Sequence, residues 1–309
     1  MIRLFVFLFL AWVSFASSSF GYYYVDEVNN ADTLSRGNAD GFTKSSQAIW
    51  GNPASLKDID HASVSFYSVQ FMDSAVRYTN YSGGLHVPIG VIAIGYYDVR
   101  IGDIKKNSLD GNGEAVTDTL YDFSNETLKA GYQLSLNEYI SLGATASLYK
   151  YNSIDFSGDG ISGDLGAVIK APFKSSAIRN AEVSVVGKNI VPNHVKFSDG
   201  TKEKIPTILS VAGQLETELD LTFYVGRKLV IDKKQLSSLG IRYRPSWIPG
   251  DALSFSAGWR EYLATNKEVK RDALSLGIGL HVLKLDLSVA YQKSDYSSEN
   301  FYYAINLTF

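Results

Sequence analysis

The last nine residues of the chain, Phe301 to Phe309, alternate between large apolar side chains and smaller or polar ones without a break. A period of two residues indicates a β-strand, and one face of this strand is apolar and uncharged. A soluble domain that ended in such a strand would expose an edge prone to aggregation. In a closed membrane barrel no edge remains and the apolar face contacts lipid, so this ending predicts a transmembrane β-barrel.

The first residues have the features of a signal peptide. Arg3 precedes an apolar run of 12 residues, Leu4 to Phe15, which is too short to span a membrane and has the length of a signal-peptide core. Small residues around Ala16 follow, where cleavage would occur. We assign residues 1–19 to a signal peptide and expect an exported protein. No later apolar stretch reaches about 18 residues, so no helical anchor is expected.

Composition excludes several other classes of protein. The 309 residues include no Cys, 20 Tyr and 16 Phe, and the formal net charge is -3. Without Cys there is no disulfide scaffold, thiolate metal site or Cys nucleophile. The nearly balanced charge argues against nucleic acid as a partner. Enrichment in Tyr and Phe fits β-strands and the aromatic girdles of membrane barrels.

From His61 onward, strand-like segments alternate with turns. In one segment Leu276 and Ile278 face one way, whereas Ser275 and Gly277 face the other. The predicted strands are 62–71, 75–87, 91–101, 119–135, 139–153, 161–173, 180–190, 206–216, 219–230, 236–246, 252–260, 273–283, 285–293 and 300–309. This gives 14 strands, or 12 if weakly alternating segments such as 62–71 are misassigned. Strand 62–71 is expected to pair with strand 300–309 and close the barrel.

Long and short connections mostly alternate along the chain. Residues 102–118 and 191–205 form long connections, whereas 88–90 and 217–218 are tight turns. Bacterial barrels have long loops outside the cell and short turns in the periplasm, and an even strand number places both chain ends in the periplasm. A soluble β-sandwich or a solenoid has no reason to segregate its loops in this way. We therefore predict an all-β fold, a transmembrane antiparallel barrel over residues 61–309.

Residues 20–60 have a different pattern and are predicted to fill the barrel as a plug. A short helix over about Lys44 to Trp50 is expected to stop at Gly51 and Pro53. Irregular backbone cannot face lipid, and a 14-strand barrel has a lumen to fill. The inward faces of the predicted strands are rich in Ser, Gly, Thr and Ala, which leaves room for a plug. An open barrel is the alternative.

The stretch Ala48 to Leu56 resembles the segment that precedes the first strand in FadL-type outer-membrane transporters and in PorV/PorQ-type proteins. Asn52-Pro53-Ala54 matches this motif fully, and Ser55 stands where the family has Gly. Residues 87–90, 186–190 and 205–206 resemble the PorV-like branch. The resemblance implies a 14-stranded barrel in the bacterial outer membrane with an N-terminal hatch. Leu307 and the terminal Phe309 likewise resemble the signal that the barrel-insertion machinery reads.

The resemblance implies transport of a small hydrophobic compound across the outer membrane. The alternative is a PorV-like, non-enzymatic scaffold or shuttle for secretion-system or surface proteins, and a structural barrel without cargo is a third reading. No predicted loop exceeds about 17 residues, whereas FadL itself has large extracellular loops. The implied partners are outer-membrane lipids, the insertion machinery, a hydrophobic ligand, and secretion or surface proteins.

Two groups of residues are candidates for function. Asn52, Pro53, Ala54 and Leu56 either shape the plug or line a passage. The charges predicted by strand parity to face the lumen are Lys129, Glu182, Arg242, Arg244, Arg260 and Asp286. Arginines among them could bind a ligand carboxylate, or pair with plug carboxylates at Asp26, Glu27, Asp32 or Asp40. Arg242 and Arg244 also fall near a predicted periplasmic turn, where lipid head groups are a third option.

Enzyme signatures are weak. The four His residues, His61, His86, His194 and His281, form no local Ser/His/Asp set and no His-x-x-x-His spacing. Residues 110–114 and 157–160 are rich in Asp and Gly and are interpreted as turns, because the full calcium-loop pattern is missing. We expect no enzymatic activity, no cofactor and no bound metal.

Overall fold

A computed structural model describes residues 30–71, 76–109, 115–153, 157–172, 175–191, 194–231, 235–263, 270–294 and 300–309. The predicted signal peptide, the plug carboxylates Asp26 and Glu27, and the predicted turn at 110–114 lie outside these residues.

Fourteen strands form a closed antiparallel barrel, which confirms the predicted fold class and the predicted strand count. The barrel strands are β1 (Ala62–Phe71), β2 (Val76–Val87), β3 (Gly90–Leu109), β4 (Ala115–Ser135), β5 (Ile140–Asn152), β6 (Ser157–Lys170), β7 (Ile178–Lys188), β10 (Ile208–Thr217), β11 (Leu221–Val230), β12 (Gln235–Tyr243), β13 (Leu253–Leu263), β14 (Lys270–Val282), β15 (Leu285–Ser294) and β16 (Asn300–Thr308). A short hairpin, β8 (His194–Phe197) and β9 (Lys202–Lys204), lies between β7 and β10.

The barrel closes where the sequence predicts. β1 and β16 pair antiparallel from Ser63 opposite Thr308 to Val69 opposite Tyr302. Along β16 the alternation is the expected one, since Phe301 is 51% exposed on the outer surface and Tyr302 is 3% exposed inside. Strand β1, whose residues alternate weakly, is therefore held in register by pairing with β16, whose residues alternate strongly.

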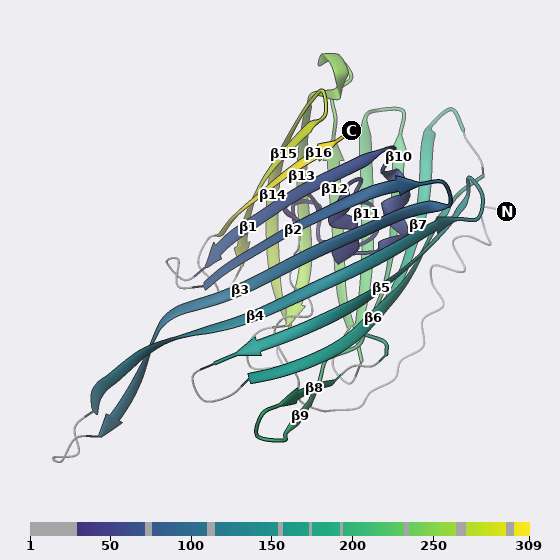
Figure 1. Cartoon of the computed structure of the whole chain (residues 1–309). Helices are drawn as coiled ribbons and strands as arrows, with labels where there is room; N and C mark the ends of the chain where they lie inside the picture. Colours follow the sequence, from purple (N-terminus) through teal and green to yellow (C-terminus); the bar gives the residue numbers. More distant parts are fainter. Residues whose placement is uncertain are drawn as a thin grey trace.

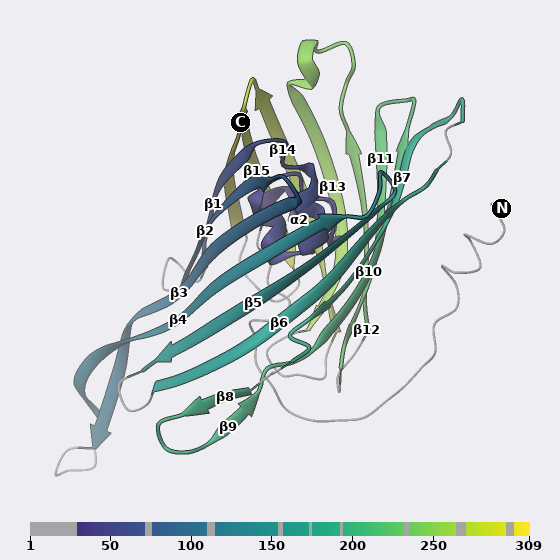
Figure 2. The same cartoon turned by 45° about the vertical axis from the view of Figure 1, so that its right-hand side comes forward.

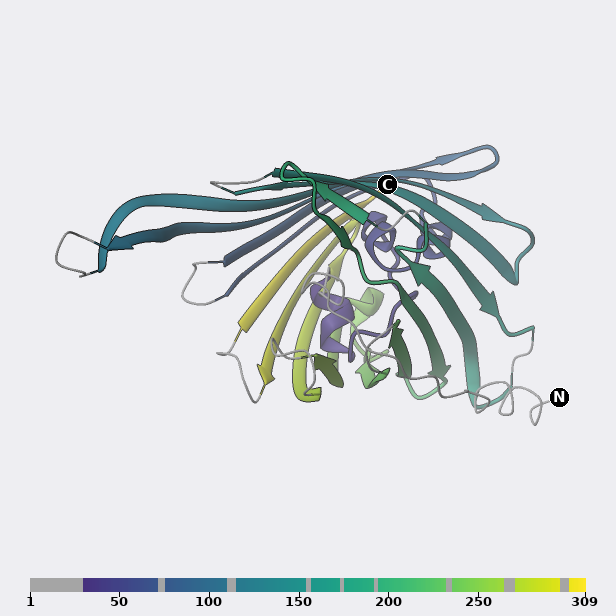
Figure 3. The ribbon, with the colours of Figure 1, turned by 90° about the horizontal axis from the view of Figure 1, so that it is seen from below.

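The two ends of the barrel differ. Short turns at 88–89, 218–220 and 283–284 lie at the end that holds Ala62 and Phe309, which we call the terminal end (Figure 1). At the opposite end, β3 and β4 continue beyond the barrel as a two-stranded ribbon, and we call this the ribbon end (Figures 1 and 3). The β8–β9 hairpin also lies there.

Three sequence-based assignments were wrong. Residues 102–118 were expected to form a loop, but the paired strands extend to Leu109 and from Ala115. Residues 191–205 were also expected to form a loop, but they contain β8 and β9. Residues 157–160 were expected to form a turn, but they belong to β6. The first two segments lie outside the barrel wall and have no lipid-facing row, so the alternation that reveals a strand is absent there. At residues 157–160, Gly and Asp gave a turn signal within a strand.

The outer surface of the barrel is apolar and the inner surface is small and polar. Leu276 is 60% exposed on the outside, whereas Ser275 is 3% exposed within. Because successive strand residues point to opposite faces, this alternation gives the wall one face suited to lipid. None of the helices in the described part of the chain is long and apolar enough to cross a membrane.

The segment before β1 lies inside the barrel (Figures 2 and 3). It comprises a helix, α2 (Ala31–Ser35), and two 3₁₀ helices, η1 (Ser46–Trp50) and η2 (Pro53–Asp58), and we call residues 30–60 the plug. Each helix begins at a side-chain cap, Asn30, Ser45 and Asn52 in turn. The helix expected at about residues 44–50 is thus η1 and ends at Gly51 as predicted. A further 3₁₀ turn, η3 (Pro249–Asp251), precedes β13.

Candidate functional site

The Asn-Pro-Ala motif fastens the plug to the barrel wall. The Asn52 side-chain nitrogen lies 2.8 Å from Ser184 Oγ and 3.2 Å from the Val185 carbonyl oxygen of β7, while Asn52 Oδ1 accepts a hydrogen bond from the Ala54 amide. Pro53 opens η2, where its missing N–H costs nothing. Leu56 is fully buried in an apolar cluster between plug and wall. These contacts favour the plug-shaping role over the lining of a passage.

Glycines on the inward face let the plug backbone approach the wall. A Cβ at Gly166 would overlap the Asn52 side chain, and one at Gly258 would overlap the backbone nitrogen of Gly37. At Gly143 it would overlap the backbone of Pro53. Close contact with the plug thus explains why these three inward positions are glycines.

One buried ion-pair cluster joins the middle of the plug to β7 and β11. The Asp40 carboxylate lies 3.1 Å from Lys188 Nζ and 3.4 Å from Lys228 Nζ. Burial alone would raise the pKa of Asp40, but the two ammonium groups outweigh it and lower the pKa to about 2. The carboxylate is therefore ionised throughout the physiological pH range.

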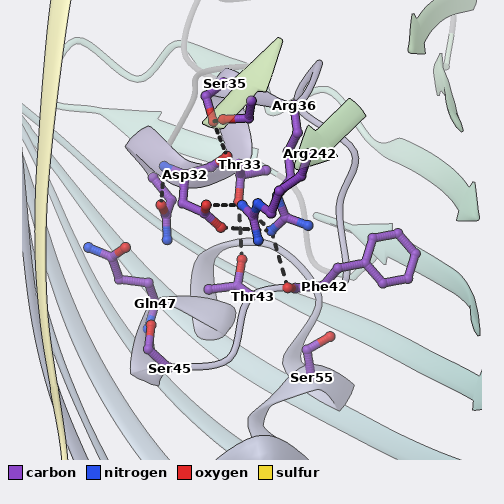
Figure 4. A network of polar contacts seen from close by, with 12 residues as sticks. Asp32, Thr33, Ser35, Arg36, Phe42, Thr43, Ser45, Gln47, Ser55 and Arg242 are labelled. Carbon is purple, nitrogen blue, oxygen red and sulfur yellow. Dashed lines mark hydrogen bonds and ion pairs between the residues drawn. The ribbon is translucent and has the colours of Figure 1, made fainter. Parts of the chain in front are cut away.

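A second cluster joins α2 to β12 (Figure 4). Asp32 binds Arg242 of the wall and also lies 3.2 Å from Arg36 of the plug. Burial opposes ionisation of Asp32, yet the two guanidinium groups hold its pKa below the ordinary value. Arg36 is fully buried, donates to the Phe42 carbonyl oxygen at 3.1 Å and stacks on Tyr224. Lys57 and Glu182, 3.1 Å apart, make a third link to the wall.

The plug separates two cavities. The ribbon-side cavity, of about 90 Å³, is lined by Trp50 from the plug and by polar and aromatic residues from the wall and hairpin, among them Asn125, Thr127, Lys129, Tyr151, Asp164 and Phe197. The terminal-side cavity is larger, about 540 Å³, and has a larger number of charged lining residues. Its lining includes Lys44, Asp58, Asp60, Arg242, Arg244 and Asp286.

The structure places the predicted lumen charges in different settings. Lys129 is buried and donates to Asp164 Oδ2 at 2.7 Å, and Arg242 pairs with Asp32. Arg260 lies 3.5 Å from Gln292 Oε1 and near the ring of Tyr262. Arg244 follows β12 and lines the terminal-side cavity. Asp286 lines the same cavity and contacts His281. They do not converge on one site.

Several residues that shape the site were missed by sequence analysis. Asp164, Lys188 and Lys228 were not singled out, although alternation within their strands places all three inside. Trp50 and Phe197 were missed for a different reason, because neither belongs to a barrel strand. Among the described residues, no group of three His, Asp or Glu side chains could hold a metal ion.

Comparisons with known proteins give the fold. No protein-family model and no curated protein matches the chain. Among solved structures, the CymD monoaromatic hydrocarbon channel has a TM-score of 0.64 at 12% identity, covering 93% of this chain and 99% of that one. The Pseudomonas putida toluene transporter TodX has a TM-score of 0.59 at 11% identity, covering 96% and 100%. A Pseudomonas aeruginosa FadL homologue has a TM-score of 0.54 at 11% identity, covering 91% and 98%. The chain therefore has the fold of FadL-like channels.

Proposed function

We propose that this protein is an outer-membrane channel that passes a small hydrophobic compound. The observation that carries the proposal is the plug, which separates an aromatic cavity at the ribbon end from a charged cavity at the terminal end. The apolar exterior supports placement in a membrane, and the short turns support a periplasmic terminal end. The hydrocarbon and toluene transport named for the similar structures agrees with a hydrophobic cargo.

Interrupted strand pairing near the ribbon end supports a sideways exit for such a cargo. β6 pairs with β7 from Leu165 to Lys170, and the Ile190 amide just after β7 still donates to the Gly163 carbonyl oxygen at 2.9 Å. Between Gly158 and Ile161 it pairs with β8 instead, and β9 pairs with β8 alone among the described strands. Among the described residues, the edge of β9 that faces away from β8 therefore has no strand partner, and β9 does not pair with β10. A hydrophobic molecule that left through such an interruption would enter the membrane without crossing the charged terminal-side cavity.

Filling the ribbon-side cavity tests the proposal. Thr127 is 5% exposed and lines the cavity, whereas its neighbour Leu128 faces outward. Uptake of p-xylene would be measured in bacterial cells that produce the wild type, Thr127→Trp, Leu128→Trp or no protein. We expect uptake with Thr127→Trp to fall to the level without protein and uptake with Leu128→Trp to match the wild type. Equal uptake by both variants would refute a passage through this cavity.

The ribbon favours a second candidate, the PorV-like scaffold. β2 pairs with β3 only up to Ile101, and β5 pairs with β4 only from Ser124, so beyond these points neither outer edge of the ribbon has a neighbouring strand among the described residues. Unpaired strand edges can bind an extended segment of another protein by strand addition. Mass spectrometry of the gently extracted protein separates the candidates, since a channel should carry small apolar compounds and a scaffold should retain a stoichiometric protein partner.

A further inference from the structure

The ribbon-side cavity has two unlike linings. Three successive inward residues of β4, Asn125, Thr127 and Lys129, are all polar and all buried. The remaining lining includes two aromatic pairs, Tyr151 with Phe197 at a ring separation of 6.1 Å, and Trp50 with Tyr97 at 5.7 Å. Flat aromatic surfaces favour a flat aromatic ligand. A plain hydrocarbon would form no hydrogen bonds with the row of polar side chains beside these rings.

The polar lining has hydrogen-bonding capacity left over. Asn125 Oδ1 and Trp50 Nε1 have no partner among the described residues, although both side chains are more than nine-tenths buried. Lys129 Nζ donates to Asp164 and lies 5.4 Å from the centre of the Trp50 ring. An ammonium group has three N–H donors, so Lys129 can also donate to a ligand. A ligand without polar atoms would leave the Asn125 oxygen and the Trp50 N–H unpaired.

The two buried ammonium groups of the cavity are already paired, whereas Lys204 and Glu203, which also line it, are exposed and half-buried, respectively. Lys129 has Asp164 at 2.7 Å, and Lys188, which also lines the cavity, has Asp40 at 3.1 Å. Asp164 accepts further hydrogen bonds from Thr145 Oγ1 at 2.8 Å and from the Asn189 amide at 2.9 Å, which hold it in place. A ligand anion that approached either ammonium would therefore meet a fixed carboxylate of like charge.

We propose that the ribbon-side cavity selects an uncharged aromatic compound that carries a hydroxyl or carbonyl oxygen, in preference to a plain hydrocarbon or an aromatic carboxylate. The aromatic rings bind the flat body, and the oxygen accepts hydrogen bonds from the polar lining. A hydroxyl can also donate to Asn125 Oδ1. This inference rests on the proposed channel function and names the class of its cargo.

Three toluenes that differ in their para substituent provide the probes. p-Xylene has no polar group, p-cresol carries a neutral hydroxyl at pH 7, and p-toluate is ionised at that pH. Their binding to the purified full-length barrel in detergent would be measured by calorimetry, with protein-free micelles as the blank. We expect p-cresol to bind at least about tenfold more tightly than either of the others.

Each of the other possible orders of affinity would contradict a specific part of the proposal. Equal or tighter binding of p-xylene would overturn the oxygen preference and leave the channel function standing. Tightest binding of p-toluate would show an anion site and overturn the proposed neutrality. If none of the three compounds bound, both this inference and the proposed channel function would fail.

Two variants test where the oxygen of the ligand binds. Asn125→Leu removes an amide oxygen that has no partner among the described residues, and should lower p-cresol affinity to that of p-xylene without weakening p-xylene. Asn306→Leu makes the same substitution on a buried residue of the terminal-side cavity, where the amide oxygen accepts a hydrogen bond from Ser45 Oγ, and should leave the affinity order unchanged. Equal losses in both variants, or no loss in Asn125→Leu, would contradict the assigned position of the oxygen.

Discussion

At the scale of single residues, the side of the wall on which a side chain lies decides what it tolerates. Leu276 is 60% exposed on the outside of β14. An Arg there would lie in lipid, so Leu276→Arg should lower the free energy of unfolding in vesicles by roughly 2–4 kcal/mol if the site is at the bilayer midplane. Denaturant titration of the reconstituted protein measures this loss.

The fair control for Leu276→Arg is an inward residue with free space beside it. Ser275 is unsuitable because its hydroxyl donates to the Leu34 carbonyl oxygen of the plug at 2.8 Å. Ser288 instead lines the terminal-side cavity, so Ser288→Arg should be tolerated better. Equal losses in the two variants would contradict the assigned facing of the wall.

Asp40 gives the plug a pH-dependent attachment. Its folded-state pKa of about 2 lies below the ordinary 3.8, so the stabilisation is complete above the ordinary value and is lost as the pH falls toward 2. A shift of this size corresponds to roughly 2 kcal/mol. At pH 7, Asp40→Asn should lower the unfolding free energy by at least that amount, because it also leaves Lys188 and Lys228 without this partner.

Unfolding titrations of Asp40→Asn at several pH values test this assignment. The difference from the wild type should shrink as the pH falls from about 4 to 2. Asp60→Asn, at an exposed residue just before β1, is the matched control and should change stability little. A difference that stayed constant with pH would show that the ion pairs of Asp40 do not stabilise the plug.

At the scale of elements, each part of the plug contacts a different sector of the wall. α2 contacts β13 to β16, η1 contacts β1 to β4, and η2 contacts β3 to β6. In Gly258→Ala, the added Cβ would overlap the backbone nitrogen of Gly37. The turn that follows α2 would therefore have to move away from β13. Overpacking of this kind costs about 1–3 kcal/mol and should expose the plug to protease.

Gly83→Ala serves as the control for Gly258→Ala. It is also a strand glycine, but the nearest atom to its added Cβ is the Ser63 carbonyl oxygen at 4.0 Å. Protease sensitivity of residues 30–60 should rise in Gly258→Ala alone. Equal sensitivity in the two variants would mean that the close approach of plug and wall is not what holds the plug.

Strands could be predicted from the sequence wherever the wall separates lipid from lumen, because that boundary imposes a period of two residues. The β3–β4 ribbon and the β8–β9 hairpin were missed because they lie beyond this boundary. Inward charges could be assigned one at a time, as with Lys129 and Arg242. The partners of inward charges could not be predicted. Asp40 and Lys188, for example, form an ion pair although they are 148 residues apart and no local pattern connects them.

At the scale of the whole molecule, the fold places unlike environments on the two sides of one plug. The ribbon side offers aromatic rings and buried ion pairs, whereas the terminal side offers a wider cavity with a larger number of charged residues. A barrel of 14 strands is wide enough to leave a lumen. We therefore expect the plug to determine whether this lumen conducts water and ions.

Removing the plug tests that role directly. A chain without residues 30–58 keeps every barrel strand, and should form a pore whose ion conductance in planar bilayers is much larger than that of the wild type, because nothing else among the described residues occupies the middle of the lumen. As a control, residues 104–121 of the ribbon would be replaced by a tight turn, which is feasible because the Asp103 amide lies 3.3 Å from the Asp122 carboxylate. This ribbon variant should conduct like the wild type. Wild-type conductance in the plug deletion, with a barrel that is folded by circular dichroism, would show that the seal is made elsewhere.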